Sequence, residues 1–377
     1  MRESLRPALR LPLLAFGMIS LVGGVLAGLA RLGLDMPAPA QAQAGGHGAL
    51  MIAAFFGTVI SLERAVALRR GWTYLGPLCA GLGGIALLIG APLWLAQGLF
   101  LLASVVLAAG SLTVLAQSRT LFAATLALGA LYWIAGNAIW LLKADIAAAV
   151  PFWMSFLVLT IAGERLELTR FLPPRPAARA LFLGVLAIVG IGTACAAAGS
   201  DGGLRLFGGG LAALAVWLLR YDIARKTVRQ SGLTRFVAVC LLSGYAWLAL
   251  GGALGAAGAF GAGQPWRDAA LHAVFLGFVF SMVIGHAPII FPAVMRVKIP
   301  YHWFFYLPLL ALQLSLLGRA AAVLGGLWPL RQAAGIANAL ALLLFILTLL
   351  AGVLRGARPR PAQPRHEPHQ PTQGVSP

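Results

Sequence analysis

The sequence predicts an all-α integral membrane protein with about twelve transmembrane helices. Its residues are 60% hydrophobic and only 10% charged, whereas soluble domains contain about 25% charged residues. Apolar runs of 18 or more residues recur along most of the chain, and each is long enough to cross roughly 30 Å of hydrocarbon. The positive charges lie in the short segments between these runs, as the topology of membrane proteins requires. Membrane topology therefore accounts for the net charge of +18. We expect a lipid bilayer as partner, and no nucleic acid.

The apolar runs divide the chain into a transmembrane domain over residues 1–354 and a disordered basic cytoplasmic tail over 355–377, rich in Pro, Arg and Gln. An Ala-Gln-Ala stretch at 40–42 follows the first run and resembles a signal-peptidase site. The run is longer than the core of a signal peptide, so we expect an uncleaved first helix. The expected spans are 11–33, 47–68, 73–92, 94–117, 120–142, 146–165, 179–199, 203–220, 235–260, 269–295, 303–325 and 333–354.

The distribution of Lys and Arg predicts the orientation of these spans. With the N-terminus inside, 22 of the 28 Lys and Arg residues fall on the inner side and six on the outer side. This bias favours twelve spans with both termini in the cytoplasm. We expect a multi-pass protein of a bacterial inner membrane.

Ionisable residues inside membrane spans are costly, so each is a functional candidate. His47 opens the second span and His272 opens the tenth, and both spans run from the outer to the inner side. The two histidines should therefore lie at nearly the same depth, close to the outer surface. We expect them to form an outer polar tier.

A second polar tier is expected near the inner surface. The rise from His272 to His286 is about 21 Å, since an α-helix advances ~1.5 Å per residue. At about 100° per residue, these two histidines should also share one face of the tenth helix. The members of this tier are Glu63, Arg64, Glu164, Arg165 and His286.

The inner tier recurs on the second, sixth and tenth spans, so every fourth helix carries it. This spacing predicts three pseudo-repeated four-helix units whose polar helices face a common centre. Alternatively, Glu-Arg at the end of a helix simply marks the membrane boundary. His286 precedes Pro288, which should kink the helix there, so this histidine is a candidate ligand, relay or gate.

The second span reads His47-Gly48-Ala49-Leu50-Met51, and on the tenth His272-Ala273-Val274-Phe275 precedes Phe280-Ser281-Met282. These stretches, together with the helix count, resemble the core subunit of heme-copper oxidases. The chain is also similar to the NnrS type of heme- and copper-containing membrane protein, which is tied to nitric oxide stress in denitrifying bacteria.

The resemblance implies one heme b held by His47 and His272, with Met51 in the same motif. It does not imply a dioxygen-reducing copper centre, because the sixth and seventh spans carry no histidine and the tenth lacks an adjacent histidine pair. Copper is a second candidate, with His47, His272 and His286 as possible ligands. In the remaining alternative, the histidines only make hydrogen bonds at helix starts.

Three functions remain open on the sequence. The first is a heme-binding membrane protein that transfers electrons to or from a partner protein, or takes part in a nitric-oxide-related stress response. The second is a secondary transporter that uses the inner Glu/Arg/His cluster, and the third is a scaffold without chemistry of its own. The sequence indicates neither an enzymatic reaction nor an oligomeric state.

Overall fold

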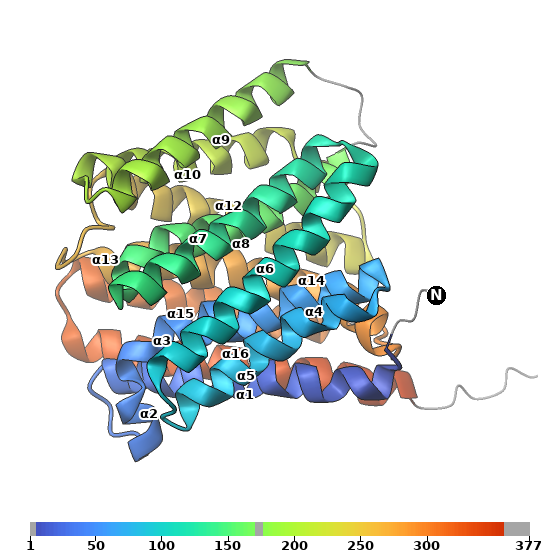
Figure 1. Cartoon of the computed structure of the whole chain (residues 1–377), viewed down its shortest axis with the longest axis horizontal. Coiled ribbons are helices and arrows are strands. Elements are labelled where there is room, and N and C mark those ends of the chain that lie inside the picture. Colours follow the sequence, from blue (N-terminus) through green and yellow to red (C-terminus); the bar gives the residue numbers. More distant parts are fainter. Residues whose placement is uncertain (1–4, 170–175, 358–377) are drawn as a thin grey trace, which may run out of the picture.

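A computed structural model describes residues 5–169 and 176–357 of the protein. Within these residues the regular structure is entirely helical, and twelve helices are long and apolar enough to cross a membrane. They run roughly side by side as one bundle (Figure 1). The predicted all-α membrane fold with twelve spans is thereby confirmed. The predicted disordered tail lies outside the described residues from position 358 onward.

Ten of the spans are essentially single helices, and two are composite. The single ones are α1 (Pro7–Arg31), α5 (Leu75–Leu88, after η3 at Gly71–Tyr74), α6 (Leu93–Ser118), α7 (Leu121–Lys143), α8 (Ile146–Thr169), α9 (Pro176–Ala197), α10 (Asp201–Tyr221), α12 (Gly232–Ala256), α15 (Tyr306–Leu324, after η5 at Trp303–Phe305) and α16 (Trp328–Ala357). Three short helices lie in connections: α2 (Ala38–Ala42), η1 (Ala44–Gly46) and α11 (Ala224–Thr227).

The two composite spans are the ones that carry the outer histidines. The second span consists of α3 (His47–Ala49), η2 (Leu50–Phe56) and α4 (Gly57–Leu68). The tenth consists of α13 (Arg267–His272), η4 (Ala273–Phe280) and α14 (Ser281–Met295). In both, the η segment is a π-helix that begins within three residues of the histidine. Such segments are rare and occur frequently at functional sites.

The π-helix in the tenth span corrects one prediction. The expectation that His272 and His286 share a helix face assumed a turn of about 100° per residue throughout. Eight of the intervening residues, Ala273–Phe280, have π geometry, which winds more loosely than an α-helix. The phase relation between the two histidines is therefore not the one that a continuous α-helix would give.

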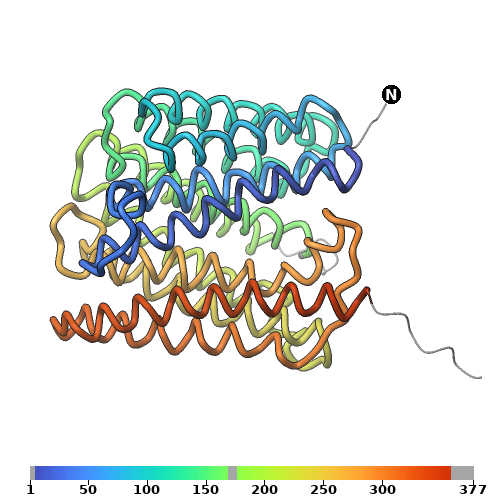
Figure 2. The backbone as a smooth tube through the Cα atoms, turned by 90° about the horizontal axis from the view of Figure 1, so that it is seen from below, coloured from blue at the N-terminus to red at the C-terminus, as the bar shows by residue number. Residues whose placement is uncertain are grey.

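The bundle has two ends, which we name by their residues. The histidine end contains His47 and His272, and the Arg165 end contains Arg165 and His286. With twelve spans, the first and last described residues lie at the same end, the Arg165 end (Figure 2). At this end three helices stop at arginines in the left-handed conformation, Arg69, Arg119 and Arg296, where a cation also meets the negative end of the helix dipole.

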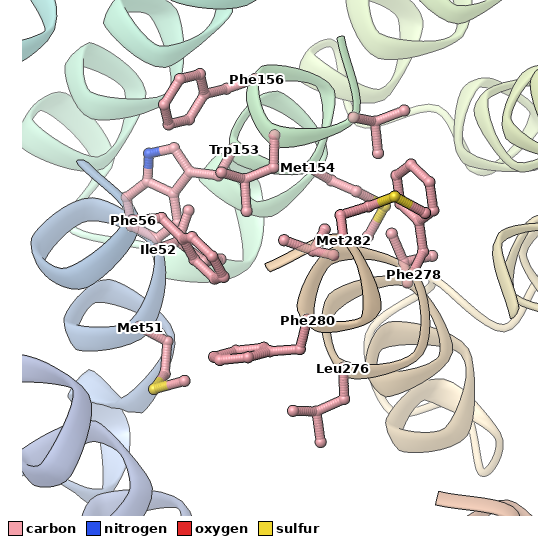
Figure 3. Packing of buried hydrophobic residues seen from close by; sticks show 14 of the residues in the cluster. Met51, Ile52, Phe56, Trp153, Met154, Phe156, Leu276, Phe278, Phe280 and Met282 are labelled. Atoms are coloured by element: carbon pink, nitrogen blue, oxygen red, sulfur yellow. The ribbon is translucent and has the colours of Figure 1, made fainter. Parts of the chain in front are cut away.

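The second, sixth and tenth spans contact one another in the centre of the bundle. The prediction that every fourth helix faces a common centre is thus supported by the packing. Buried apolar side chains fill the space between the three spans at middle depth (Figure 3). They include Met51, Ile52 and Phe56 from the second span, Trp153, Met154 and Phe156 from α8, and Leu276, Phe278, Phe280 and Met282 from the tenth span.

This central apolar layer separates the two polar groups. Phe280 stands beside both Phe55 and Phe56, with ring centroids 5.9 Å and 5.2 Å away. Phe55 and Phe56 themselves lie 4.8 Å apart. Phe56 and Phe280 form the floor beneath His47 and His272, and Phe55 packs against both of these rings. The histidine end and the Arg165 end are therefore distinct environments.

Candidate functional site

The structure brings His47 and His272 together at the histidine end, as the sequence predicts. Their ring centroids lie 6.4 Å apart, and the ring planes are inclined by 21°. This separation is too long for face-to-face contact between two imidazoles. The two side chains instead flank a common space, although 225 residues separate them in the chain.

The hydrogen bonds of the two rings fix their tautomers. Nδ1 of His47 lies 2.7 Å from the carbonyl oxygen of Gly24 on α1. Nδ1 of His272 lies 2.8 Å from the carbonyl oxygen of Asp268, one turn earlier on α13. A carbonyl oxygen only accepts, so each Nδ1 must donate and each Nε2 of a neutral ring keeps its lone pair. Within the described residues neither Nε2 has a hydrogen-bond partner.

A cavity of about 550 Å³ adjoins the two histidines. Such a volume suits a small-molecule ligand or cofactor. The wall of the cavity is apolar on the side of the central layer, where it contains Met51, Phe56 and Phe280. The predicted candidate Met51 thus lies in the same site as His47 and His272.

The wall on the other side of this cavity is strongly basic. Four arginines line it, and Asp268 is the one acidic residue among its described lining residues. Arg267 and Arg331 each bury an Nε atom that has no partner in the described part of the chain. The arginines are Arg31, Arg267, Arg319 and Arg331. An anionic group in the cavity would supply the missing partners.

Asp268 connects His272 to two of these arginines. Its carboxylate accepts two hydrogen bonds from Arg319, through Nε and Nη2, both at 2.9 Å. Arg331 approaches the same carboxylate at 3.2 Å, and Nδ1 of His272 lies 3.3 Å from it. Arg319 reaches further to Asn338, which donates to Ser315. The tenth, eleventh and twelfth spans are tied together beside the histidine.

Sequence reasoning missed Asp268, Arg319 and Arg331 as site residues, because charges near span ends were counted only for topology. One signal was present for Asp268. It precedes His272 by four residues, the spacing that places two side chains on one face of a helix. The arginines come from other spans, and no local pattern indicates their partner.

A second polar group lies at the Arg165 end. Arg165 is buried and donates through Nε to Asp222, at 2.9 Å, just after the end of α10. Its Nη1 lies 3.4 Å from Nε2 of His286. Nδ1 of His286 is 2.8 Å from the carbonyl oxygen of Met282, so this Nδ1 donates and Nε2 accepts from the arginine.

This arrangement adds Asp222 to the inner polar tier. In the described residues the partner of Arg165 is Asp222, a residue that the sequence analysis did not single out, and not the adjacent Glu164. Consecutive residues on a helix point about 100° apart, so the arginine extends to a neighbouring element. Glu63, Arg64 and Glu164 are half-buried at the same end of the bundle.

The structure does not bring His286 to the other two histidines. It lies beyond the central apolar layer and contacts Arg165. Among the described residues no group of three or more His, Cys, Asp or Glu side chains is placed to hold a metal ion. The three predicted metal candidates thus form a pair at one end and a single residue at the other.

Comparison with known proteins adds a family to this description. A search of curated proteins finds no match to the chain. A family model described as "Domain of unknown function (DUF8744)" matches residues 10–354, a range that holds ten spans in full, nearly all of the first and last, and both polar groups. The chain therefore belongs to the family described as Domain of unknown function (DUF8744).

Proposed function

We propose that the protein binds one heme b between His47 and His272 and works as an electron-transferring or nitric-oxide-related heme protein of the membrane. The observation that carries the proposal is the histidine pair itself. Each ring directs its Nδ1 proton to a backbone carbonyl and keeps a free lone pair on Nε2. Histidines that ligate metals are held in this way, with the second nitrogen donating to a fixed acceptor.

The spacing of the rings supports the same ligand. A metal–nitrogen bond is ~2 Å long and Nε2 lies roughly 1.2 Å from its ring centre, so two imidazoles that share one metal ion would have centroids at most about 6.4 Å apart. The two rings here lie 6.4 Å apart. Copper remains a less favoured alternative, because a pair of nitrogen ligands alone makes an incomplete copper site.

The charges of the cavity also suit a heme. A heme carries two carboxylates on one edge and a largely apolar ring elsewhere. The cavity has arginines on one side and Met51, Phe56 and Phe280 on the other. Carboxylates pair well with arginine through charge-assisted hydrogen bonds, and the unpartnered Nε atoms of Arg267 and Arg331 are available for them.

A heme held by His47 and His272 would supply reversible one-electron transfer. The residues of the chain would hold and orient it, neutralise its carboxylates and exclude water through the floor of Phe56 and Phe280. An electron partner would be a separate protein. No dioxygen-reducing centre is part of the proposal.

The visible spectrum of the protein purified in detergent tests this function. We expect a sharp reduced α-band that disappears in His47→Ala and in His272→Ala. His302→Ala is the matched control, because His302 lies at the other end of the bundle, where its Nδ1 accepts from the backbone of Phe304, and the band should persist. A colourless wild-type protein, or a band that survives both substitutions at the pair, would contradict the proposal.

One observation favours a secondary transporter as the second candidate. The buried pair of Arg165 and Asp222 next to His286 is an ionisable group of the kind that binds protons or ions in membrane carriers. Under this proposal, protein in sealed liposomes would move protons or small ions, and Arg165→Gln would abolish the flux. A heme spectrum without any flux would decide for the first candidate.

A further inference from the structure

The two histidines of the cavity are held in chemically different ways. His47 donates to a neutral backbone carbonyl of another helix, Gly24 on α1. His272 donates to the carbonyl of Asp268 and also lies 3.3 Å from the carboxylate of the same residue. A negative charge beside Nδ1 makes the opposite nitrogen of the ring a stronger electron donor. The pair is therefore electronically asymmetric.

The carboxylate that causes this asymmetry is fixed by arginines from two other helices. Arg319 on α15 grips both of its oxygens at 2.9 Å, and Arg331 on α16 approaches one of them at 3.2 Å. A two-point arginine contact sets the position and the plane of a carboxylate. The side chain of Asp268 is only 15% exposed, so water screens its charge little.

We propose that Asp268 is the positioning residue of His272, and that the Asp268–Arg319–Arg331 network sets the redox potential of the metal group held by the histidine pair. The inference rests on the proposed heme function and adds to it a residue that determines the potential. The carboxylate stabilises the oxidised, more positive state of the metal. Arg331, whose charge has the opposite sign, shifts the balance towards the reduced state.

The two charges allow a test with opposite signs. In the full-length protein, Asp268→Asn should move the midpoint potential upward, and Arg331→Gln should move it downward. Asp268→Asn should also weaken heme retention by about 10- to 100-fold, the range found for residues that orient a metal-binding histidine. Spectroelectrochemical titration gives the potential, and competition with a heme-binding apoprotein gives the retention. A merely structural role would not produce opposite shifts.

Asp35→Asn is the matched control. Asp35 is an exposed carboxylate at the same end of the bundle and accepts a hydrogen bond from Gln41 at 3.1 Å, a role that asparagine also fills. Neither the potential nor the retention should change in this variant. If Asp268→Asn does not fold, Arg331→Gln alone still tests the inference. A lower midpoint potential in this variant supports it, and an unchanged or higher one overturns it.

The outcomes separate the two proposals. A wild-type protein without heme overturns the proposed function and this inference with it. A wild-type protein with a bis-histidine heme, whose potential stays the same in Asp268→Asn and Arg331→Gln, leaves the function intact and overturns the inference. Shifts of equal sign in both variants also overturn it.

Discussion

His47 keeps its orientation because α1 passes very close to it. A Cβ atom on Gly28 would lie 2.8 Å from both Nδ1 and Cε1 of the His47 ring. One turn earlier on the same helix, the carbonyl oxygen of Gly24 receives the Nδ1 proton. The glycine at 28 is therefore required by close approach, and its lack of a side chain allows the ring to reach its acceptor.

This contact predicts the effect of Gly28→Ala. The added methyl group would push the imidazole away from Gly24, so heme content should fall severalfold or more while the helices remain intact. Heme absorbance per protein and circular dichroism measure the two quantities. Gly98→Ala is the control, because a Cβ at Gly98 meets nothing within 4 Å. Full heme content in Gly28→Ala would refute this account of the ring.

Whole helices were easier to predict from the sequence than their internal geometry. Length and apolarity were enough to locate all twelve spans. The π-helices at Leu50–Phe56 and Ala273–Phe280 could not be anticipated, because their residues are ordinary apolar ones and the looser winding depends on packing against neighbouring spans. Each π-helix begins within three residues of a histidine of the cavity and ends at a phenylalanine of the floor, so the geometry of the site depends on both.

The Arg165–Asp222 pair joins α8 to the segment after α10. Both side chains are almost completely buried, and Asp222 also accepts a hydrogen bond from the backbone of Ala224 at 2.7 Å. Removing one partner of a buried pair leaves an uncompensated charge. Removing either side chain is therefore expected to destabilise the protein by more than the intact pair stabilises it.

A double-mutant cycle tests this. Arg165→Met and Asp222→Leu should each destabilise the protein by about 3–5 kcal/mol, whereas the double variant should recover much of that loss. Thermal unfolding in one detergent gives the comparison, and the exposed Arg225→Met, in the neighbouring α11, is the control with little expected effect. If the double variant were as unstable as the sum of the singles, the pair would not be the reason for the loss.

Across the molecule, the sequence predicted the depth of the polar residues in the bundle but not which residues they contact. Helical rise placed His47 with His272 and Arg165 with His286, and these groups do meet. Asp222 was missed because it is 57 residues from Arg165 in the chain, and the ion pair exists only once α10 has packed near α8. The arginines around Asp268 were missed for the same reason. The contacts of Asp222 and Asp268 depend on which helices pack against each other.

The two ends of the molecule differ in charge, and this difference predicts its orientation. Of the 22 Lys and Arg residues within positions 5–169 and 176–357, 16 lie at the Arg165 end and six at the histidine end. Segments rich in Lys and Arg stay in the cytoplasm. We therefore propose that the Arg165 end faces the cytoplasm of a bacterial cell and that the histidine cavity opens near the outer surface, where an external electron partner could reach it.

Cysteine labelling in intact cells tests this orientation. Cys195 is exposed, so the test uses a Cys195→Ser background. Ala262→Cys, in the connection at the histidine end, should react with an impermeant maleimide in whole cells. Gln230→Cys, in a connection at the Arg165 end, should react only after lysis, since both positions are exposed and only the membrane distinguishes them. The reverse pattern would place the cavity on the cytoplasmic side, and its electron partner would then have to be a cytoplasmic protein.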